Sequence, residues 1–277
     1  MTAKTLVIYH GDCTDGLTAA WAFRNLNPGV EASYLPASHG DAPPEVAEAA
    51  LYILDFAYPR AVTTRLAEEA GSLLILDHHK SAEADLEGLP YCEFDMERSG
   101  AGITWDYFAQ DHQPRPWLVD LIEDRDLWRY AYGDTTREAI AYISTLPLTF
   151  EAWDKLAAED ATSVAEKGRA IRSYIEHYGE VASRDAVFRE IGGFLVPLIN
   201  ISHQQASDHV NRLLLEYPSY PFAGSFFLRG DGRWRFSLRS VGDFDVSAIA
   251  AQYGGGGHRN ASGFRLPTLP WESGSEA

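Results

Sequence analysis

Three short apolar runs in the first third of the chain, each followed at once by ionisable residues, restrict the possible fold more than any other feature. The runs are Thr5–Tyr9, Leu51–Leu54 and Leu73–Leu76. They are apolar throughout, as strands buried on both faces are, and helix-like segments separate them. This alternation predicts βαβ units and therefore a parallel sheet flanked by helices.

The chain continues with a helical middle and a second α/β region. The first helix-like segments are Gly16–Leu26, Pro43–Ala50 and Pro59–Ala70. Later helical patterns cover 100–110, 117–123, 135–146, 150–160, 163–189, 202–217 and 246–253, and later strand patterns cover 194–201, 224–230, 233–240 and 262–266. We expect an α/β protein with an N-terminal parallel-sheet domain (1–148), a helical linker (149–190), a smaller C-terminal α/β domain (191–267) and a disordered tail (268–277).

Composition limits the class of protein. A chain of 277 residues is long for one domain and comfortable for two. The formal net charge of −17 argues against a protein that coats long nucleic acid, because that mode of binding uses many basic contacts to phosphate. No apolar run is long enough to cross a bilayer, and two cysteines are too few for a disulfide framework. We expect a cytoplasmic protein whose partners include neither membrane nor long duplex nucleic acid.

The residues that follow the apolar runs are the candidate site. They are His10, Asp12 and Asp15 after the first run, Asp55 after the second, and Asp77, His78 and His79 after the third. The carboxyl ends of parallel strands meet at one edge of a sheet, where ligands bind. A single Asp after a strand is usually a helix cap or a turn residue, and a structural polar network is the alternative for the whole group.

His and Asp are ligands that divalent ions such as Mn²⁺ accept, and this edge offers more of them than one ion needs. Two ions about 3.5–4 Å apart can hold a water between them and clamp a phosphate during in-line displacement. Asp55 follows the middle run, and it is our candidate for the carboxylate that bridges the two ions.

Five sequence motifs resemble those of a known family in order and spacing. They are HGDCTDG with LTAAWAF after it (10–23), LDF (54–56), LDHH (76–79), EDRDLW (123–128) and GGGGHRNASGF (254–264). The set resembles the DHH phosphoesterases with their C-terminal associated domain, and the match covers nearly the whole chain. The family includes RecJ-type exonucleases, pyrophosphatases, exopolyphosphatases, nanoRNases and cyclic-dinucleotide phosphodiesterases. The resemblance implies a catalytic domain at 1–148 and a substrate-binding associated domain at 191–267.

The resemblance also implies roles for individual residues. The implied metal ligands are His10, Asp15, Asp55, His78 and Asp126. Asp77 would orient its neighbours through hydrogen bonds, and His79 would contact the substrate phosphate or assist proton transfer. Two positions leave alternatives open. Many relatives have Asp where this chain has Cys13, so Cys13, Asp12 or water could complete the first group, and we expect Cys13 near the metal but not essential. Asp124 is the alternative to Asp126.

The C-terminal region offers candidates for substrate binding. Gly255, Gly256 and Gly257 would let backbone N–H groups approach an anion, with His258 and Asn260 beside them. A tight turn between strands is the alternative explanation for the glycines. Arg239 and Ser240 resemble substrate-contacting residues of the associated domain, and an Arg fork suits phosphate oxygens.

Together these features predict a phosphodiesterase that uses two Mn²⁺ ions, with Mg²⁺ or Co²⁺ as possible substitutes. Its substrates would be short single-stranded RNA, linear dinucleotides or cyclic nucleotides, cut to mononucleotides. A phosphomonoesterase, exopolyphosphatase or pyrophosphatase is an alternative with the same chemistry. A non-catalytic nucleotide-binding sensor is an alternative of another class. The sequence leaves monomer and homodimer open.

Overall fold

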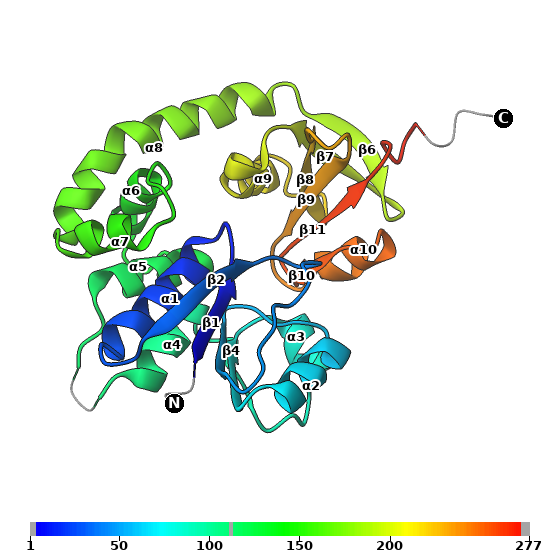
Figure 1. The fold of residues 1–277 in the computed structure, drawn as a ribbon. Helices are drawn as coiled ribbons and strands as arrows, with labels where there is room; N and C mark the ends of the chain where they lie inside the picture. Colours follow the sequence, from blue (N-terminus) through cyan, green and yellow to red (C-terminus); the bar gives the residue numbers. More distant parts are fainter. Residues whose placement is uncertain (1–3, 111–112, 273–277) are drawn as a thin grey trace. The chain divides into compact units, whose positions relative to one another are not determined.

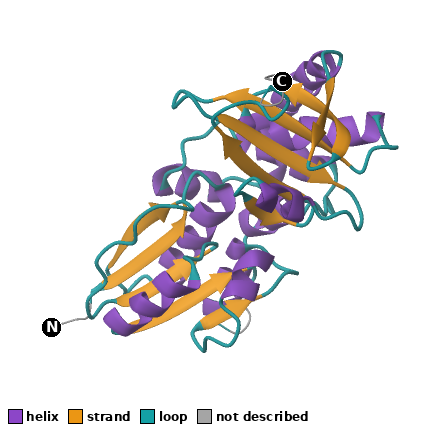
Figure 2. Ribbon diagram, turned by 90° about the vertical axis from the view of Figure 1, so that its right-hand side faces the viewer, coloured by secondary structure: helices purple, strands orange, loops and turns teal. Residues whose placement is uncertain are grey.

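The computed structural model describes residues 4–110 and 113–272, except for the side chains of residues 203–205. It divides into two compact units, Met1–Arg172 and Ser173–Ala277. Each unit contains a sheet with helices packed on it (Figures 1 and 2). Among the described residues, no helix combines the length and the apolar character that a membrane span requires. The predicted α/β fold class, with an N-terminal parallel sheet and a C-terminal sheet domain, is confirmed.

The sheet of the first unit is parallel, and its described residues form five strands in the order β2-β1-β3-β4-β5. The strands are β1 (Thr5–His10), β2 (Ala32–Ala37), β3 (Ala50–Leu54), β4 (Ser72–Asp77) and β5 (Cys92–Phe94). The central strands β1, β3 and β4 are the three predicted from apolar runs. The order of connection reverses between β1 and β3, so the crevice beyond their carboxyl ends is the place where ligands bind in such sheets.

Helices cover both faces of this sheet. On one face, α1 (Thr14–Leu26), α4 (Gly100–Phe108) and α5 (Trp117–Asp126) share a core with Val7, Leu54 and Leu76 of the strands. On the other face lie α2 (Arg60–Glu69) and α3 (Lys80–Asp85), where Leu66 of α2 and Leu86, the residue after α3, share a core with Ile8 and Ile53. The next helices are α6 (Asp134–Ile143), α7 (Phe150–Ala157) and α8 (Ala161–Ser183), and the boundary between the two units falls within α8.

Two helix predictions were wrong in this half of the chain. The segment Pro43–Ala50 is a loop that enters β3, in which Val46 and Ala49 are buried and Ala50 N donates to Lys4 O. Its two prolines lack backbone donors, and pairing with the sheet captures its end. The helix predicted for Ser163–Arg189 ends at Ser183, because β6 (Val187–Ile191) pairs with a neighbouring strand.

The second unit contains a mixed sheet, whose described residues form six strands in the order β10-β11-β9-β8-β7-β6. Its further strands are β7 (Phe194–Asn200), β8 (Phe222–Leu228), β9 (Trp234–Ser240), β10 (Gly256–His258) and β11 (Ala261–Leu266). Helix α9 (His203–Glu216) packs on the face that carries Ala223, and α10 (Val246–Gln252) packs on the face that carries Phe222.

Part of the predicted tail packs on the second unit. Leu269 is buried, and the Trp271 ring meets the rings of Phe226 and Phe236. The expectation of disorder was therefore wrong for residues 268–272, because two apolar side chains in this stretch cover the edge of the core. Residues 273–277 lie outside the described residues.

Candidate metal centre

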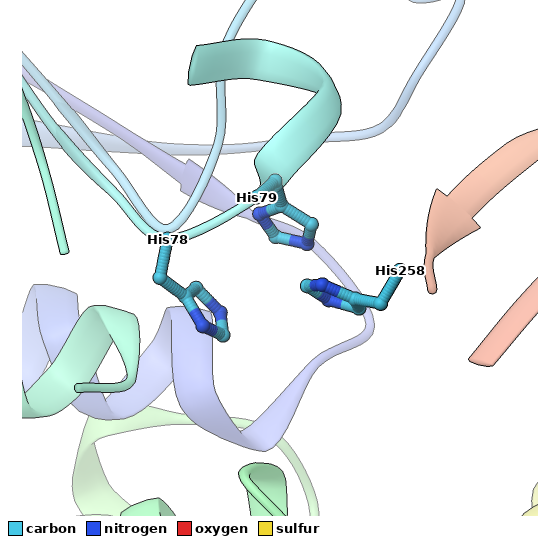
Figure 3. Close-up of side chains that lie close together, drawn as sticks. All are labelled: His78, His79 and His258. Atoms are coloured by element: carbon cyan, nitrogen blue, oxygen red, sulfur yellow. The ribbon is translucent and has the colours of Figure 1, made fainter. Parts of the chain in front are cut away.

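The ionisable side chains of the first unit gather at the carboxyl edge of its sheet. His10 ends β1, and Asp55 follows β3. His78 and His79 lie between β4 and α3 (Figure 3). Asp15 lies in the first turn of α1 and Asp126 is the last residue of α5. Two of the resulting groups have ligand atoms within 4.8 Å of one another: His10, Cys13 and Asp55, and Asp15, His78 and Asp126.

Asp55 lies between these groups and is 1% exposed. Its Oδ2 atom is 3.5 Å from His10 Nδ1 and 3.8 Å from Cys13 Sγ. Its Oδ1 atom is 3.2 Å from His78 Nε2 and makes no hydrogen bond to any described residue. The φ angle of Asp55 is 54°, a left-handed conformation that costs a non-glycine residue about 1 kcal/mol or more. One strained carboxylate thus faces both groups, one through each oxygen.

His78 is buried, and carboxylates surround its Nε2 atom. Besides Asp55, Asp126 Oδ2 lies at 3.5 Å and Asp15 Oδ2 at 3.8 Å. Burial opposes the charged imidazole, but Asp55 and Asp126 outweigh burial and raise the pKa of His78 to about 10. Burial, together with the neighbouring Asp55 and Asp126, raises the pKa of Asp15 well above its usual value. The carboxylates repel one another because one imidazole cannot neutralise them.

Divalent cations fit this arrangement. A 2+ charge would remove the repulsion among buried carboxylates and would use the unbonded Asp55 Oδ1. Two ligands that each lie about 2.1 Å from one ion are about 3 Å apart. The distances from His78 Nε2 to its two nearest carboxylates, 3.2 and 3.5 Å, are close to that value. The side chains of His10 and Asp126 are partly exposed, with 26% and 32% of their surfaces accessible. Solvent can therefore reach the centre beside these two residues.

Asp15 also holds a helix in place. Its Oδ2 atom accepts a hydrogen bond from Gly100 N at 2.7 Å and its Oδ1 atom accepts one from Ala101 N at 3.1 Å. These amides form the first turn of α4, where a carboxylate satisfies free donors and the helix dipole favours negative charge. The orientation of Asp15 is therefore fixed by α4 before any ion binds.

Asp77 and His79 form a pair beside the metal-ligating atoms. Asp77 is fully buried, and its Oδ1 atom lies 2.6 Å from His79 Nδ1. The same oxygen accepts hydrogen bonds from His78 N at 2.7 Å and His79 N at 3.3 Å. Burial opposes the charged imidazole, but Asp77 outweighs burial and raises the pKa of His79. The pair therefore favours an imidazolium whose Nε2–H is turned away from Asp77.

The two aspartates of the EDRDLW motif have different surroundings in the structure. Asp124 accepts hydrogen bonds from Ala131 N at 2.7 Å, from Tyr132 N and from Thr136 Oγ1, so both its oxygens hold the loop after α5. Asp126 faces His78 instead. Asp12, the other alternative from the sequence, is exposed in the turn before α1.

Two residues near the centre are absent from the candidates predicted from sequence. Glu123 is buried, accepts a hydrogen bond from Ser99 N at 3.0 Å and is paired with Arg115, so it supports the start of α4. Its place in EDRDLW was a usable signal. His39 follows β2, and its ring centroid is 5.9 Å from that of His10. The sequence offered no signal for it, because β2 was not predicted.

The glycine-rich segment of the second unit is shaped largely by strand pairing. A Cβ atom on Gly255 would lie 2.1 Å from Gly263 O, and one on Gly257 would lie 2.6 Å from Ala261 O. Gly256 has no heavy atom within 4 Å of its Cβ position. Close approach of this segment to β11 thus explains Gly255 and Gly257, whereas Gly254 and Gly256 have open space beside them.

The other candidates of the second unit lie near the end of β9. Arg239 Nη2 donates to Ser207 Oγ at 2.6 Å. Ser240 Oγ donates to Phe244 O at 2.7 Å and accepts from Asn260 Nδ2 at 2.9 Å, which ties β9 to the turn before β11. His258 ends β10, opposite Ala261. Ser240 and Asn260 therefore hold the backbone of this turn.

Comparison with known proteins places the chain in a family. The DHHA1 domain family matches residues 192–276. The uncharacterized protein R106 of Acanthamoeba polyphaga mimivirus is 32% identical, over 96% of this chain and 69% of that protein. The oligoribonuclease NrnB of Bacillus subtilis (strain 168) is 28% identical, over 80% of this chain and 61% of that protein. The chain belongs to the DHH phosphoesterase superfamily.

Solved structures show the same fold as this DHH phosphoesterase. The exonuclease RecJ bound to manganese superimposes with a TM-score of 0.52 at 14% identity, over 95% of this chain and 86% of that one. Members of the superfamily are metal-dependent phosphoesterases, and the first unit of this member presents His and Asp groups that could hold ions.

Proposed function

We propose that this chain is a two-metal phosphodiesterase that cuts short oligoribonucleotides, linear dinucleotides or cyclic nucleotides to mononucleotides. The observation that carries the proposal is the position of Asp55, whose Oδ1 faces His78 and whose Oδ2 faces His10. Asp55 would bridge two ions. His10 would complete one ion's ligands, and Asp15, His78 and Asp126 would complete the other's. We take Mn²⁺ as the working ion, since RecJ binds it, with Mg²⁺ or Co²⁺ as substitutes.

When bound, two ions supply Lewis acidity at the phosphate and lower the pKa of water. The residues of the chain supply orientation and proton transfer. Asp77 holds His79 through Nδ1, so that His79 Nε2–H can donate a hydrogen bond to a phosphate oxygen. Asp15, anchored on the first turn of α4, keeps its carboxylate fixed beside His78. Asp55 and Asp77 are buried, so solvent does not reach the centre past these two side chains.

The proposed substrate class rests on similarity to NrnB, an oligoribonuclease, and on the chemistry of the second unit. Arg239 would hold a phosphate that is not cut, with open space at Gly256 for its approach. His258 would assist, while Ser240 and Asn260 would shape the turn. We also propose a cytoplasmic location, which the shortage of cysteines supports.

A product assay tests this function. With Mn²⁺ present, we expect mononucleotides from a dinucleotide, a five-residue RNA or a cyclic dinucleotide. Asp55→Asn should lower the rate by roughly 10³-fold or more, because both ions lose a shared ligand. Asp12→Asn is the matched control, since its side chain is exposed. Consumption of polyphosphate or pyrophosphate alone would assign the chain to another substrate class, and ion binding without any turnover would make it a sensor.

A further inference from the structure

Cys13 stands at a helix N-cap but does not cap the helix. It is the N-cap residue of α1, with extended backbone angles, and its side chain makes no capping hydrogen bond. Good capping residues are Ser, Thr, Asp and Asn, whereas a thiol caps poorly. Its thiol instead donates a weak hydrogen bond to Asp55 Oδ2, with Sγ 3.8 Å from that oxygen. The side chain is therefore directed at the candidate metal centre.

The distances around Asp55 Oδ2 suit three ligands of one tetrahedral ion. With metal–sulfur and metal–oxygen bonds of about 2.3 and 2.1 Å, a tetrahedral angle puts sulfur about 3.6 Å from oxygen. A nitrogen ligand would lie about 3.4 Å from the same oxygen. The structure gives 3.8 Å for Cys13 Sγ and 3.5 Å for His10 Nδ1.

The second group differs in chemistry. Around His78 Nε2, the neighbouring ligand atoms are all carboxylate oxygens, from Asp15, Asp55 and Asp126. Oxygen-rich groups suit Mn²⁺ and Mg²⁺, whereas a thiolate selects softer ions such as Zn²⁺ and Co²⁺. Asp55 thus separates an oxygen-rich group from a group that contains sulfur.

We propose that Cys13 is a thiolate ligand, so that the His10, Cys13 and Asp55 group selects a softer divalent ion than the Asp15, His78 and Asp126 group does. The inference rests on the proposed two-metal function, but it makes a separate claim about ligand identity. On binding, the thiol loses its proton to solvent and sulfur donates an electron pair to the ion. An ion held by these three residues would accept water or a phosphate oxygen as a further ligand, as in catalytic sites with three protein ligands.

Cobalt spectroscopy tests this ligand directly. We expect Co²⁺ added to the metal-free protein to produce a near-ultraviolet band of thiolate-to-cobalt charge transfer. Cys13→Ser should abolish the band. Cys92→Ser is the matched control, because Cys92 is also half-buried but belongs to none of the ligand groups found among the described residues, and it should keep the band. Visible ligand-field bands from bound Co²⁺ without the charge-transfer band in the wild-type protein would overturn the proposal.

Cys13→Asp provides a second measurement. Replacing sulfur by oxygen should raise the ratio of Mn²⁺ affinity to Zn²⁺ affinity at one of the two metal sites by roughly tenfold or more. An unchanged ratio in competition titrations would contradict thiolate ligation. These readouts are independent of hydrolysis. A charge-transfer band in a protein that cuts no substrate would support Cys13 as a ligand and contradict the proposed function. Hydrolysis without the band would support the proposed function and contradict Cys13 as a ligand.

Discussion

Asp124 and Asp126 stand two residues apart at the end of α5, and their hydrogen bonds give them different roles. Both oxygens of Asp124 accept hydrogen bonds, one from Ala131 N in the loop that follows the helix and the other from Thr136 in α6. Asp126 has an oxygen 3.5 Å from His78 Nε2, and partial burial, together with the nearby Asp55, raises the pKa of its carboxyl group. A carboxylate with a raised pKa destabilises the folded protein when it is ionised, so Asp126 favours metal binding at the expense of the metal-free state.

Exchanging each residue for asparagine should separate these roles. Asp126→Asn should weaken binding of one ion by roughly 10- to 100-fold or more and should leave the metal-free protein as stable as the wild type, or more stable. Asp124→Asn should lower the melting temperature with and without ions, because a buried oxygen loses its donors. Calorimetric titration with Mn²⁺ and thermal unfolding measure both effects. Equal loss of ion affinity in the two variants would contradict the assignment.

The sequence predicts the site residues that lie at the ends of strands. Asp55 and His78 directly follow apolar strands, so topology alone brings them together. The choice between Asp124 and Asp126 needed side-chain hydrogen bonds, and the direction of Cys13 needed the start of α1. Neither can be deduced from spacing, because the contacts of Asp126 with His78 and of Cys13 with Asp55 join segments that are distant in the chain.

At the scale of elements, the start of α4 lies against the loop that carries Asp55. A Cβ atom on Gly100 would lie 2.3 Å from Asp55 Cβ, and Gly100 N donates to Asp15. Gly16 shows the same feature on α1, where a Cβ atom would lie 2.3 Å from His10 O. Glycine at these two positions lets helices approach the ends of β3 and β1 closely enough for their side chains to meet.

Gly100→Ala should therefore displace Asp55. We expect a loss of about 1–3 kcal/mol in the free energy of unfolding, together with loss of at least one bound ion. Gly29→Ala is the control, since no heavy atom lies within 4 Å of its Cβ position. Denaturant unfolding and metal analysis test this, and normal ion content in a destabilised Gly100→Ala protein would argue against the close approach as the cause.

In the second sheet, Arg235 of β9 stands directly opposite Arg265 of β11. Burial, with Arg265 and Arg229 nearby, lowers the pKa of Arg235. Like charges opposite each other in an antiparallel pair are destabilising. Arg265→Thr should therefore stabilise the protein by about 0.5 kcal/mol, and added sulfate should stabilise the wild type more than the variant. Thermal unfolding at low salt checks this, and a less stable variant would refute it.

The elements that sequence patterns missed are at the edges of sheets. The outer strand β2 contains Pro36 and is half exposed, and β5 has three residues, so neither shows an apolar run. The central strands were predicted because burial on both faces demands apolar residues throughout. The end of α8 was missed because no glycine or proline marks it, and pairing of β6 with β7 decides where the helix stops.

At the scale of the whole molecule, ion binding should be coupled to folding. Each ion bound only by the folded chain, at a hundredfold excess over its Kd, adds roughly 2.7 kcal/mol to the free energy of unfolding. A chelator should therefore lower the melting temperature by several degrees, and Mn²⁺ should restore it. Asp55→Asn should respond far less. A melting temperature that changes neither with chelator nor with added Mn²⁺ would show that the centre holds no ions.

The crowding of carboxylates around His78 has a consequence for the lifetime of the protein in a cell. A chain that lacks ions keeps the repulsion among Asp15, Asp55 and Asp126, so it opens more often than a loaded chain does. Proteases act on such openings, and their rate follows the population of the open form. Metal scarcity would thus reduce the amount of this protein as well as the activity of each copy, and supply of the ion would set its abundance.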